Sequence, residues 1–350
     1  MDDVTLTFHA IDEPQPGARW QARFEATWPD YRRWYLRAGD AARPSYAVAR
    51  AMLQRHMPEL VPAWQRLVEL AGGGDVAARM LSLYHPPPLV SGCSQAVFPG
   101  PDPVLVRNYD FDPALLEGVV YASELTGRRV VGMSDCLWGL LDGMNGDGLA
   151  VSLAFGGRRT VQEGFAISLV VRYLLETCAT AADAVATLRR LPVQASYNLT
   201  LLDRGGTAAT ARVAPGCAPV LGPAAVATNH QEVVEWEEHA RVTASVEREA
   251  RMLALLADPA TAERDFVGAF LEPPLHANAY GSGFGTLYTA VHRPVGGVVE
   301  YRWPGEAWRQ SLDAFAEGSR TVRLSGTKRS KDCSQVSPGQ RYSTRPSAGW

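Results

Sequence analysis

The sequence predicts a layered α+β sandwich that follows a largely helical N-terminal segment. Three observations indicate this class: short β-rich runs begin after the proline run at 86–88, helical runs interrupt them, and strand patterns return towards the C-terminus. The order sheet, helices, sheet, helices, sheet suits a layered sandwich better than strict alternation of strand and helix. The chain has 350 residues, of which 46% are hydrophobic and 20% are charged, so it can bury a sizeable core.

The segment before residue 93 begins with one expected strand and continues as helix. Residues 4–8 alternate between apolar and polar side chains, and Pro14 ends that pattern. Between residues 44 and 70 the apolar side chains recur at helical spacing, interrupted by Pro58 and Pro62, and the glycine run at 72–74 closes the pattern. We therefore expect residues 1–92 to be a largely helical unit.

The segment after residue 93 shows strand and helix patterns in turn. Strands are expected at residues 94–98, 104–109, 129–133, 149–155, 197–202, 207–213, 286–292 and 298–303. Helices are expected at residues 165–177, 180–191 and 239–256. Thr180 and Asp183 form a capping-box pattern that opens the second of these helices.

The C-terminal residues 325–350 differ from the rest of the chain. They are polar and contain its only lysines, Lys328 and Lys331. We expect this tail to be unstructured or non-native, which leaves residues 93–324 as the catalytic domain.

The charge balance excludes several classes of partner. The 34 basic and 37 acidic residues give a net charge of −3, which leaves no positive excess for nucleic acid or for an anionic membrane surface. No run approaches the ~18 apolar residues of a membrane span, and the acidic start is unlike a signal peptide, so we expect a cytoplasmic protein. The expected partner is a small molecule, and neither a cofactor nor a metal is expected.

Cysteine chemistry in this chain points to one residue. The five cysteines are an odd set without C-x-x-C spacing, which argues against a disulfide framework or a zinc site. Cys93 follows Gly92 and precedes an expected strand that carries Arg107 and Asp110. A cation there favours the thiolate, and a carboxylate can hold the cation or an amine. The alternative for any single cysteine is a small buried residue at the start of a strand.

Further motifs follow Cys93 in a fixed order within residues 85–305. They are RNYDF from Arg107, GMNGDGLAV from Gly143, YNLTLLD from Tyr197, ATNH from Ala227 and SVER from Ser245. Together they resemble the N-terminal-nucleophile amidases, the family of choloylglycine hydrolases, penicillin V acylases and acyl-coenzyme A:6-aminopenicillanic acid acyltransferases. The resemblance implies a four-layer αββα sandwich and an enzyme that cleaves linear amide bonds or thioesters through an acyl thioester on Cys93.

The resemblance also implies autocatalytic cleavage between Gly92 and Cys93. The thiol attacks the carbonyl carbon of Gly92, and a glycine there lets the backbone bend without a Cβ clash. Hydrolysis exposes an α-amine that titrates at about 7.7–8.0 and can take the thiol proton itself, so no histidine is needed. Residues 1–92 then form a separate chain that is expected to stay associated with residues 93–350.

The resemblance assigns roles to four more residues. Arg107 and Asp110 orient the nucleophile and its amine, and Arg248 supports that network. Asn198 matches an asparagine whose side-chain amide donates to the tetrahedral oxyanion. The alternatives are a structural ion pair for the charged residues and a backbone cap for Asn198. Asn145 is expected to serve turn geometry.

One departure from the bile-salt and penicillin V branch concerns residues 152–155, where that branch has a further asparagine or tyrosine. The second oxyanion donor is then expected to be a backbone N–H, and the long segment before Cys93 is closer to the acyltransferase branch. An apolar, aromatic-walled acyl pocket is expected from side chains near the GMN turn. These are Trp138, Leu140, Leu141, Phe155 and Phe165.

Two other functions stay open from the sequence. One is a non-catalytic, unprocessed small-molecule binding relative of the same fold, against which the complete set of Arg107, Asp110 and Asn198 argues. The other is a Cys/His protease, whose mechanism depends on a histidine base. A metal site built from His230, Glu235, Glu238 and His239 matches no standard spacing, and a solvated helix face is the preferred interpretation.

Overall fold

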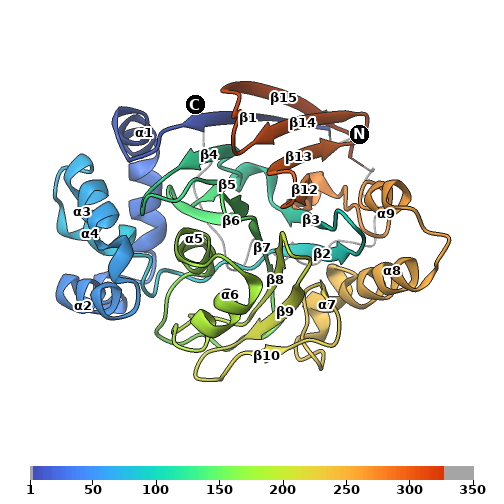
Figure 1. Cartoon of the computed structure of the whole chain (residues 1–350). Helices are drawn as coiled ribbons and strands as arrows, with labels where there is room; N and C mark the ends of the chain where they lie inside the picture. Colours follow the sequence, from blue (N-terminus) through green and yellow to red (C-terminus); the bar gives the residue numbers. More distant parts are fainter. Residues whose placement is uncertain (1–2, 327–350) are drawn as a thin grey trace.

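The computed structural model describes residues 3–326, which form two β-sheets and the helices around them (Figure 1). The nine-stranded sheet has the order β10-β9-β8-β7-β6-β5-β4-β1-β15, and the six-stranded sheet has the order β11-β2-β3-β12-β13-β14. The strands are β1 Val4–Asp12, β2 Gly92–Phe98, β3 Val104–Phe111, β4 Val119–Ser123, β5 Val130–Asp135, β6 Gly139–Asn145, β7 Leu149–Phe155, β8 Tyr197–Asp203, β9 Ala208–Val213, β10 Val220–Leu221, β11 Val226–Ala227, β12 Gly285–Arg293, β13 Val298–Trp303, β14 Glu306–Ser311 and β15 Gly318–Leu324.

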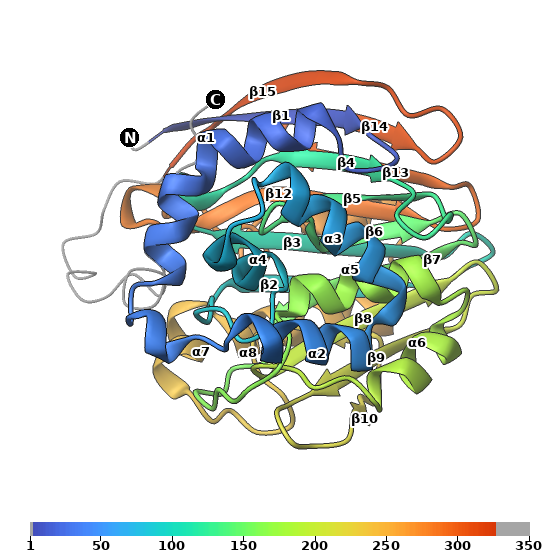
Figure 2. The ribbon, with the colours of Figure 1, turned by 90° about the vertical axis from the view of Figure 1, so that its left-hand side faces the viewer.

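Helices cover the outer faces of both sheets. The α-helices are α1 Ala18–Tyr35, α2 Tyr46–His56, α3 Val61–Leu70, α4 Asp75–Leu81, α5 Ile167–Thr177, α6 Ala181–Leu188, α7 Glu237–Val242, α8 Ser245–Ala257 and α9 Glu263–Ala269. Helix α5 packs on β6 and β7, whereas α8 packs on β2 and β11 of the other sheet. Figure 2 shows α1 to α6 in front of the strands. The predicted four-layer αββα sandwich is therefore confirmed.

The N-terminal segment is more closely built into the fold than its sequence suggests. Its strand β1 lies inside the nine-stranded sheet, parallel to β4 and antiparallel to β15. Helix α1 was not predicted, whereas the helical run at 44–70 is divided into α2 and α3 at Pro58, one of the two prolines expected to interrupt it. A proline cannot continue the helical hydrogen bonding of the preceding turn, which explains the break.

Strand β6 of the large sheet was missed because glycine occupies its interior. Gly132 in β5 and Gly143 in β6 lie opposite each other. A Cβ built on Gly143 would lie 2.8 Å from the Val131 carbonyl oxygen and 3.1 Å from the Gly132 Cα, so the two backbones approach too closely for side chains. The run that reads as a turn in the sequence is therefore a strand selected for close packing.

Other predictions have clear outcomes. The capping box of Thr180 and Asp183 opens α6 as predicted. The expected helix at 239–256 is divided into α7 and α8 by Ala244, whose φ of 49° is left-handed. Within residues 3–326 no helix is both long and apolar enough to cross a membrane. Of the predicted tail, residues 327–350 lie outside the described part of the chain.

Candidate active site

Cys93 lies in β2, and its side chain is fully buried between the two sheets. The backbone N–H of Cys93 donates to Asn229 Oδ1 at 2.9 Å. Its sulfur lies 3.4 Å from a terminal guanidinium nitrogen of Arg107 and 3.8 Å from Ser91 Oγ. Separate polar groups therefore contact the nitrogen and the sulfur of the same residue.

The register of β2 and β3 places the predicted partners of Cys93 on two faces. Cys93 pairs with Tyr109, so the alternation of side chains puts Arg107 on the same face as the sulfur. Asp110 pairs with Gly92 and points to the opposite face, towards α8. Arg107 thus meets the thiol directly, whereas Asp110 reaches the surroundings of Cys93 through other groups.

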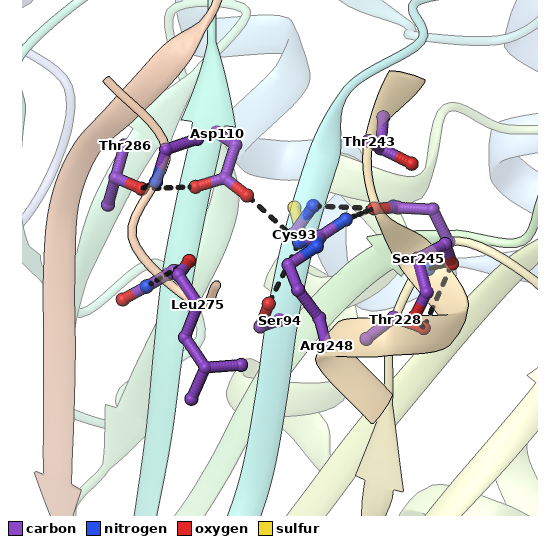
Figure 3. A network of polar contacts seen from close by, with 12 residues as sticks. Cys93, Ser94, Asp110, Thr228, Thr243, Ser245, Arg248, Leu275 and Thr286 are labelled. Carbon is purple, nitrogen blue, oxygen red and sulfur yellow. Dashed lines mark hydrogen bonds and ion pairs between the residues drawn. The ribbon is translucent and has the colours of Figure 1, made fainter. Parts of the chain in front are cut away.

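Arg248 joins Asp110 to the nitrogen side of Cys93 (Figure 3). One terminal nitrogen of this buried guanidinium donates to Asp110 Oδ2 at 2.9 Å, and the other donates to Asn229 Oδ1 at 2.7 Å. Thr286 Oγ1 donates to the second oxygen of Asp110 at 2.7 Å. The Asn229 oxygen is thereby fixed between Arg248 and the Cys93 nitrogen.

On the side away from the thiol, Arg107 forms hydrogen bonds with groups of both sheets. Its Nε donates to the Leu153 carbonyl at 3.1 Å. One terminal nitrogen donates to Asp142 Oδ2 at 2.6 Å and to the Tyr288 hydroxyl at 2.8 Å. The other carboxylate oxygen of Asp142 lies 3.3 Å from His292 Nε2. The remaining terminal nitrogen of Arg107 is the one that faces the thiol.

Burial dominates the electrostatics of the thiol. It raises the pKa of Cys93 above its ordinary value, and the positive charge of Arg107 offsets this only in part. Burial alone would also raise the pKa of Asp142, but the nearby His292 and the charge of Arg107 outweigh it and hold that pKa below its usual value. The intact chain therefore holds a protonated thiol beside a paired, charged arginine.

Gly92 lies where β2 has no room for a side chain. Its φ is not in the left-handed range, so no strained backbone is needed at this position. A Cβ built on Gly92 would instead lie 2.6 Å from the Phe284 ring and 3.1 Å from the Asp110 Cβ. The absence of a side chain at residue 92 lets β2 pass under the Phe284 ring.

Asn198 does not contact Cys93 through its side-chain amide. Its Nδ2 donates to the carbonyls of Thr228 at 3.0 Å and His230 at 2.8 Å, which engages both amide hydrogens. These bonds clamp the loop that carries Asn229. The backbone-cap alternative describes this geometry, and Asn229 takes the position beside Cys93.

A comparison of the sequence with protein families finds one match. The family is described as acyl-coenzyme A:6-aminopenicillanic acid acyl-transferase, and it matches residues 97–308, more than half of the chain. The chain belongs to this family. It is therefore an N-terminal-nucleophile hydrolase or acyltransferase that acts on amide bonds. The matched range includes Arg107, Asp110, Asn198 and Arg248 and begins within β2, after Cys93.

Solved structures of similar fold come from three kinds of enzyme. Penicillin V acylase from Agrobacterium tumefaciens has a TM-score of 0.43 and 15% identity over 63% of this chain and 86% of its own. A variant of conjugated bile acid hydrolase from Clostridium perfringens has a TM-score of 0.46 and 9% identity over 69% and 100%. The Caenorhabditis elegans ortholog of N-acylethanolamine-hydrolyzing acid amidase has a TM-score of 0.40 and 18% identity over 59% and 93%. No curated protein matches the chain.

In this acyl-transferase family member, a narrow cavity adjoins Cys93. The cavity is lined by Ser91, which lies two residues before Cys93, and by Tyr109, which pairs with Cys93 across β2 and β3. Of the five predicted wall residues only Leu141 lines the cavity. The other four are buried in the core, because position near the GMN turn in sequence does not place a side chain on the cavity. They are Trp138, Leu140, Phe155 and Phe165.

Sequence reasoning missed two groups of this site. Asn229 was present in the ATNH motif, but nothing in its local pattern distinguishes it from Asn198. Asp142 and His292 lie far apart in the chain and meet only because β6 and β12 face each other across the sandwich. Of the rejected metal ligands, His230 pairs through its Nε2 with Glu249 at 3.1 Å.

Proposed function

We propose that this protein is an autoprocessed cysteine amidohydrolase or acyltransferase whose nucleophile is Cys93. One observation carries the proposal: Asn229 and Arg248 are arranged around the nitrogen of Cys93, while Arg107 faces its sulfur. A structural cysteine needs neither arrangement. An enzyme that uses the α-amine of the nucleophile as its own base needs both.

Processing is an acyl transfer within the chain. The Cys93 sulfur attacks the carbonyl carbon of Gly92, the C–N bond breaks, and the thiol proton passes to the departing nitrogen. Water then cleaves the thioester and leaves a carboxylate on Gly92 and a free amine and thiol on Cys93. Arg107 stabilises the negative charge that develops on sulfur.

The new amine then acts as the general base. An α-amine titrates at about 7.7–8.0, and the neighbouring positive charge of Arg248 favours its neutral form. The amine takes the thiol proton, the thiolate attacks the substrate carbonyl, and the amine returns the proton to the leaving group. Water or an amine then accepts the acyl group.

Asn229 is the candidate donor to the tetrahedral oxyanion. Its Nδ2 now lies 3.3 Å from the Ser91 carbonyl oxygen and 3.2 Å from the Phe155 carbonyl oxygen. Once the bond after Gly92 is cut, the contact with Ser91 can be replaced by a substrate oxygen. We assign Asn198 the supporting role of holding the Asn229 loop.

The two processed chains are expected to stay together. The N-terminal chain supplies β1, which lies between β4 and the edge strand β15 of the nine-stranded sheet. In addition, Arg23 in α1 forms a buried ion pair with Glu117 at 3.1 Å, and the Trp20 indole donates to the Leu137 carbonyl at 3.2 Å. Cleavage at residue 92 breaks none of these contacts.

Intact mass spectrometry of purified protein tests the proposal. We expect two chains, 1–92 and 93–350, in the wild type and one full-length chain in Cys93→Ala. Cys136→Ser is the matched control, because Cys136 is also buried and lines the same cavity, yet the control should still be cleaved. An active full-length chain refutes the mechanism, and a full-length inactive chain favours the binding-relative alternative.

A further inference from the structure

His239 is a buried imidazole that the proposed mechanism has not used. It lies in α7, and only 3% of the residue is exposed. Among residues 3–326, neither of its ring nitrogens completes a hydrogen bond. Buried polar groups are nearly always hydrogen-bonded, because leaving one unpaired costs free energy. The presence of a histidine here therefore needs an explanation other than the stability of the fold.

Aromatic packing fixes the position of the His239 ring. Phe155, at the end of β7, meets it edge to face with ring centroids 5.3 Å apart. Trp236 lies against it with ring centroids 5.2 Å apart, and the guanidinium carbon of Arg159 lies 4.6 Å from the centroid of the Trp236 ring. These contacts hold the imidazole in place and use neither of its nitrogens.

The Ser91 carbonyl is the group that the imidazole approaches. Burial lowers the pKa of His239 to about 4, the charge of Arg248 acts in the same direction, and an interaction with the Ser91 backbone acts against both. A hydrogen-bond partner that raises the pKa of an imidazole must be an acceptor, and the acceptor of a peptide backbone is the carbonyl oxygen. A ring nitrogen of His239 is thus directed at that oxygen.

The side chain of Asn229 is directed at the same oxygen. Its Nδ2 lies 3.3 Å from the Ser91 carbonyl oxygen and 3.2 Å from the carbonyl oxygen of Phe155, the residue whose ring packs on His239. An amide N–H and an imidazole N–H, from two different segments of the chain, therefore converge on one acceptor. An oxygen that takes the place of the Ser91 carbonyl meets both donors.

We propose that His239 is a second donor to the tetrahedral oxyanion and acts beside Asn229. This inference rests on the proposed function and adds a catalytic residue to it. Before processing, the imidazole N–H is directed at the Ser91 carbonyl. After processing, it meets the substrate oxygen on which negative charge develops when Cys93 attacks. We assign this role to His239 in place of the backbone N–H expected from the sequence.

A neutral imidazole suits an oxyanion donor. Because burial lowers the pKa of His239 to about 4, the ring is uncharged at neutral pH and carries one N–H. It is a weak base at that pH, so it does not compete with the α-amine of Cys93 for the thiol proton. A neutral imidazole N–H still polarises a carbonyl as its oxygen gains charge.

Hydrolysis of p-nitrophenyl octanoate tests the assignment, with the rate of Cys93→Ala subtracted and kcat expressed per processed chain. His239→Phe keeps an aromatic ring and removes both nitrogens. Its kcat should fall at least about tenfold with KM within about threefold, because acylation and deacylation both pass through a tetrahedral oxyanion. Its melting temperature should not fall, because no hydrogen bond of the ring is lost.

Three results for His239→Phe overturn the proposal. The first is an unchanged kcat. The second is a melting temperature that falls together with kcat, which assigns the histidine a structural role. The third is a folded variant that stays full-length in intact mass spectrometry, which places the histidine in processing instead of turnover.

Variants that carry an amide restore a donor. His239→Asn and His239→Gln place an amide N–H near the positions of Nδ1 and Nε2, respectively. The better of the two should exceed His239→Phe in kcat by about fivefold or more, as a recovered hydrogen bond to a charged oxygen supplies. If neither does, the donor role is wrong.

His56→Phe is the matched control. The ring of His56 in α2 packs on Phe165 with centroids 6.2 Å apart, and its Nδ1 lies 3.2 Å from the Arg190 carbonyl oxygen. It thus combines an aromatic contact with a backbone carbonyl, as His239 does, and its replacement should leave kcat unchanged. A loss equal to that of His239→Phe overturns the assignment.

Failure of the proposed function gives a different result. The wild type then stays full-length in intact mass spectrometry, or it hydrolyses the ester no faster than Cys93→Ala, and the role of His239 falls with the mechanism. A processed and active wild type whose His239→Phe variant keeps its kcat refutes the role of His239 alone.

Discussion

The substitution Asp142→Asn removes the charge behind Arg107 while keeping the size of the side chain. Asp142 is fully buried, and its carboxylate lies 2.6 Å from an Arg107 nitrogen. Removal of one partner from a buried ion pair costs about 3–5 kcal/mol. At about 2 °C per kcal/mol, we expect the melting temperature to fall by roughly 6–10 °C.

A second buried pair provides the control. Arg172 and Glu176 in α5 lie 3.2 Å apart, and both side chains are fully buried, as in the pair of Arg107 and Asp142. Glu176→Gln should therefore lower the melting temperature by a similar amount. Because this pair makes no contact with Cys93 among the contacts described, Glu176→Gln should leave the titration of the thiol unchanged.

The titration of Cys93 distinguishes the two variants. Without Asp142, the charge of Arg107 is less neutralised, so the pKa of the thiol should fall. We expect a fall of about 0.5 to 1 unit, below the 1 to 3 units that a direct charge contact produces. The assay is alkylation against pH, resolved by mass spectrometry to the peptide that carries Cys93. An equal shift in both variants, or an upward shift in Asp142→Asn, refutes a positioning role for Asp142.

Three further outcomes are expected. Asn229→Ala should lower kcat per processed chain by about 10²–10³ with little change in KM, measured by steady-state kinetics, and an unchanged kcat rules out the oxyanion role. Gly92→Ala should slow the appearance of the 93–350 chain, because the new Cβ would lie 2.6 Å from the Phe284 ring. Adding Phe284→Leu should restore the rate of cleavage, and a double variant as slow as the single one contradicts the steric explanation. The pKa of Asp142 is depressed, so the stabilisation that its carboxylate provides is present above the ordinary value of 3.8 and is lost as the pH falls below it. The melting temperature should therefore decline less steeply below that pH in Asp142→Asn than in the wild type.

The order of strands and helices was predictable because apolar residues recur at helical or strand spacing in most elements. The β-rich runs around β2, β3, β7 and β8 and the capping box of α6 are local patterns. Helix α1 was not found, because its aromatic and arginine residues pack against other elements and give a weak repeat in sequence. Strand β6 was not found, because its glycines serve close packing between strands.

The candidate site was predictable to the extent that its residues follow Cys93 at recognisable spacings. Arg107 and Arg248 lie beside the sulfur side and the nitrogen side of Cys93. The choice between Asn198 and Asn229 was not predictable, because both asparagines lie in polar stretches near strand ends. Their different directions depend on the pairing of β2 with β11, which only the folded chain defines.

The position of β1 has a consequence for the timing of maturation. Strand β1, the first strand described, pairs along its length with β15, the last strand described, from Val4 opposite Leu324 to Ala10 opposite Gly318. The large sheet can therefore close only after nearly the whole chain has been made, and cleavage in a folded site must come later. After the proposed cut, the same pairing joins two chains instead of two segments of one chain. Refolding of the proposed two-chain form would depend on protein concentration, so its lifetime would rest on slow unfolding more than on refolding.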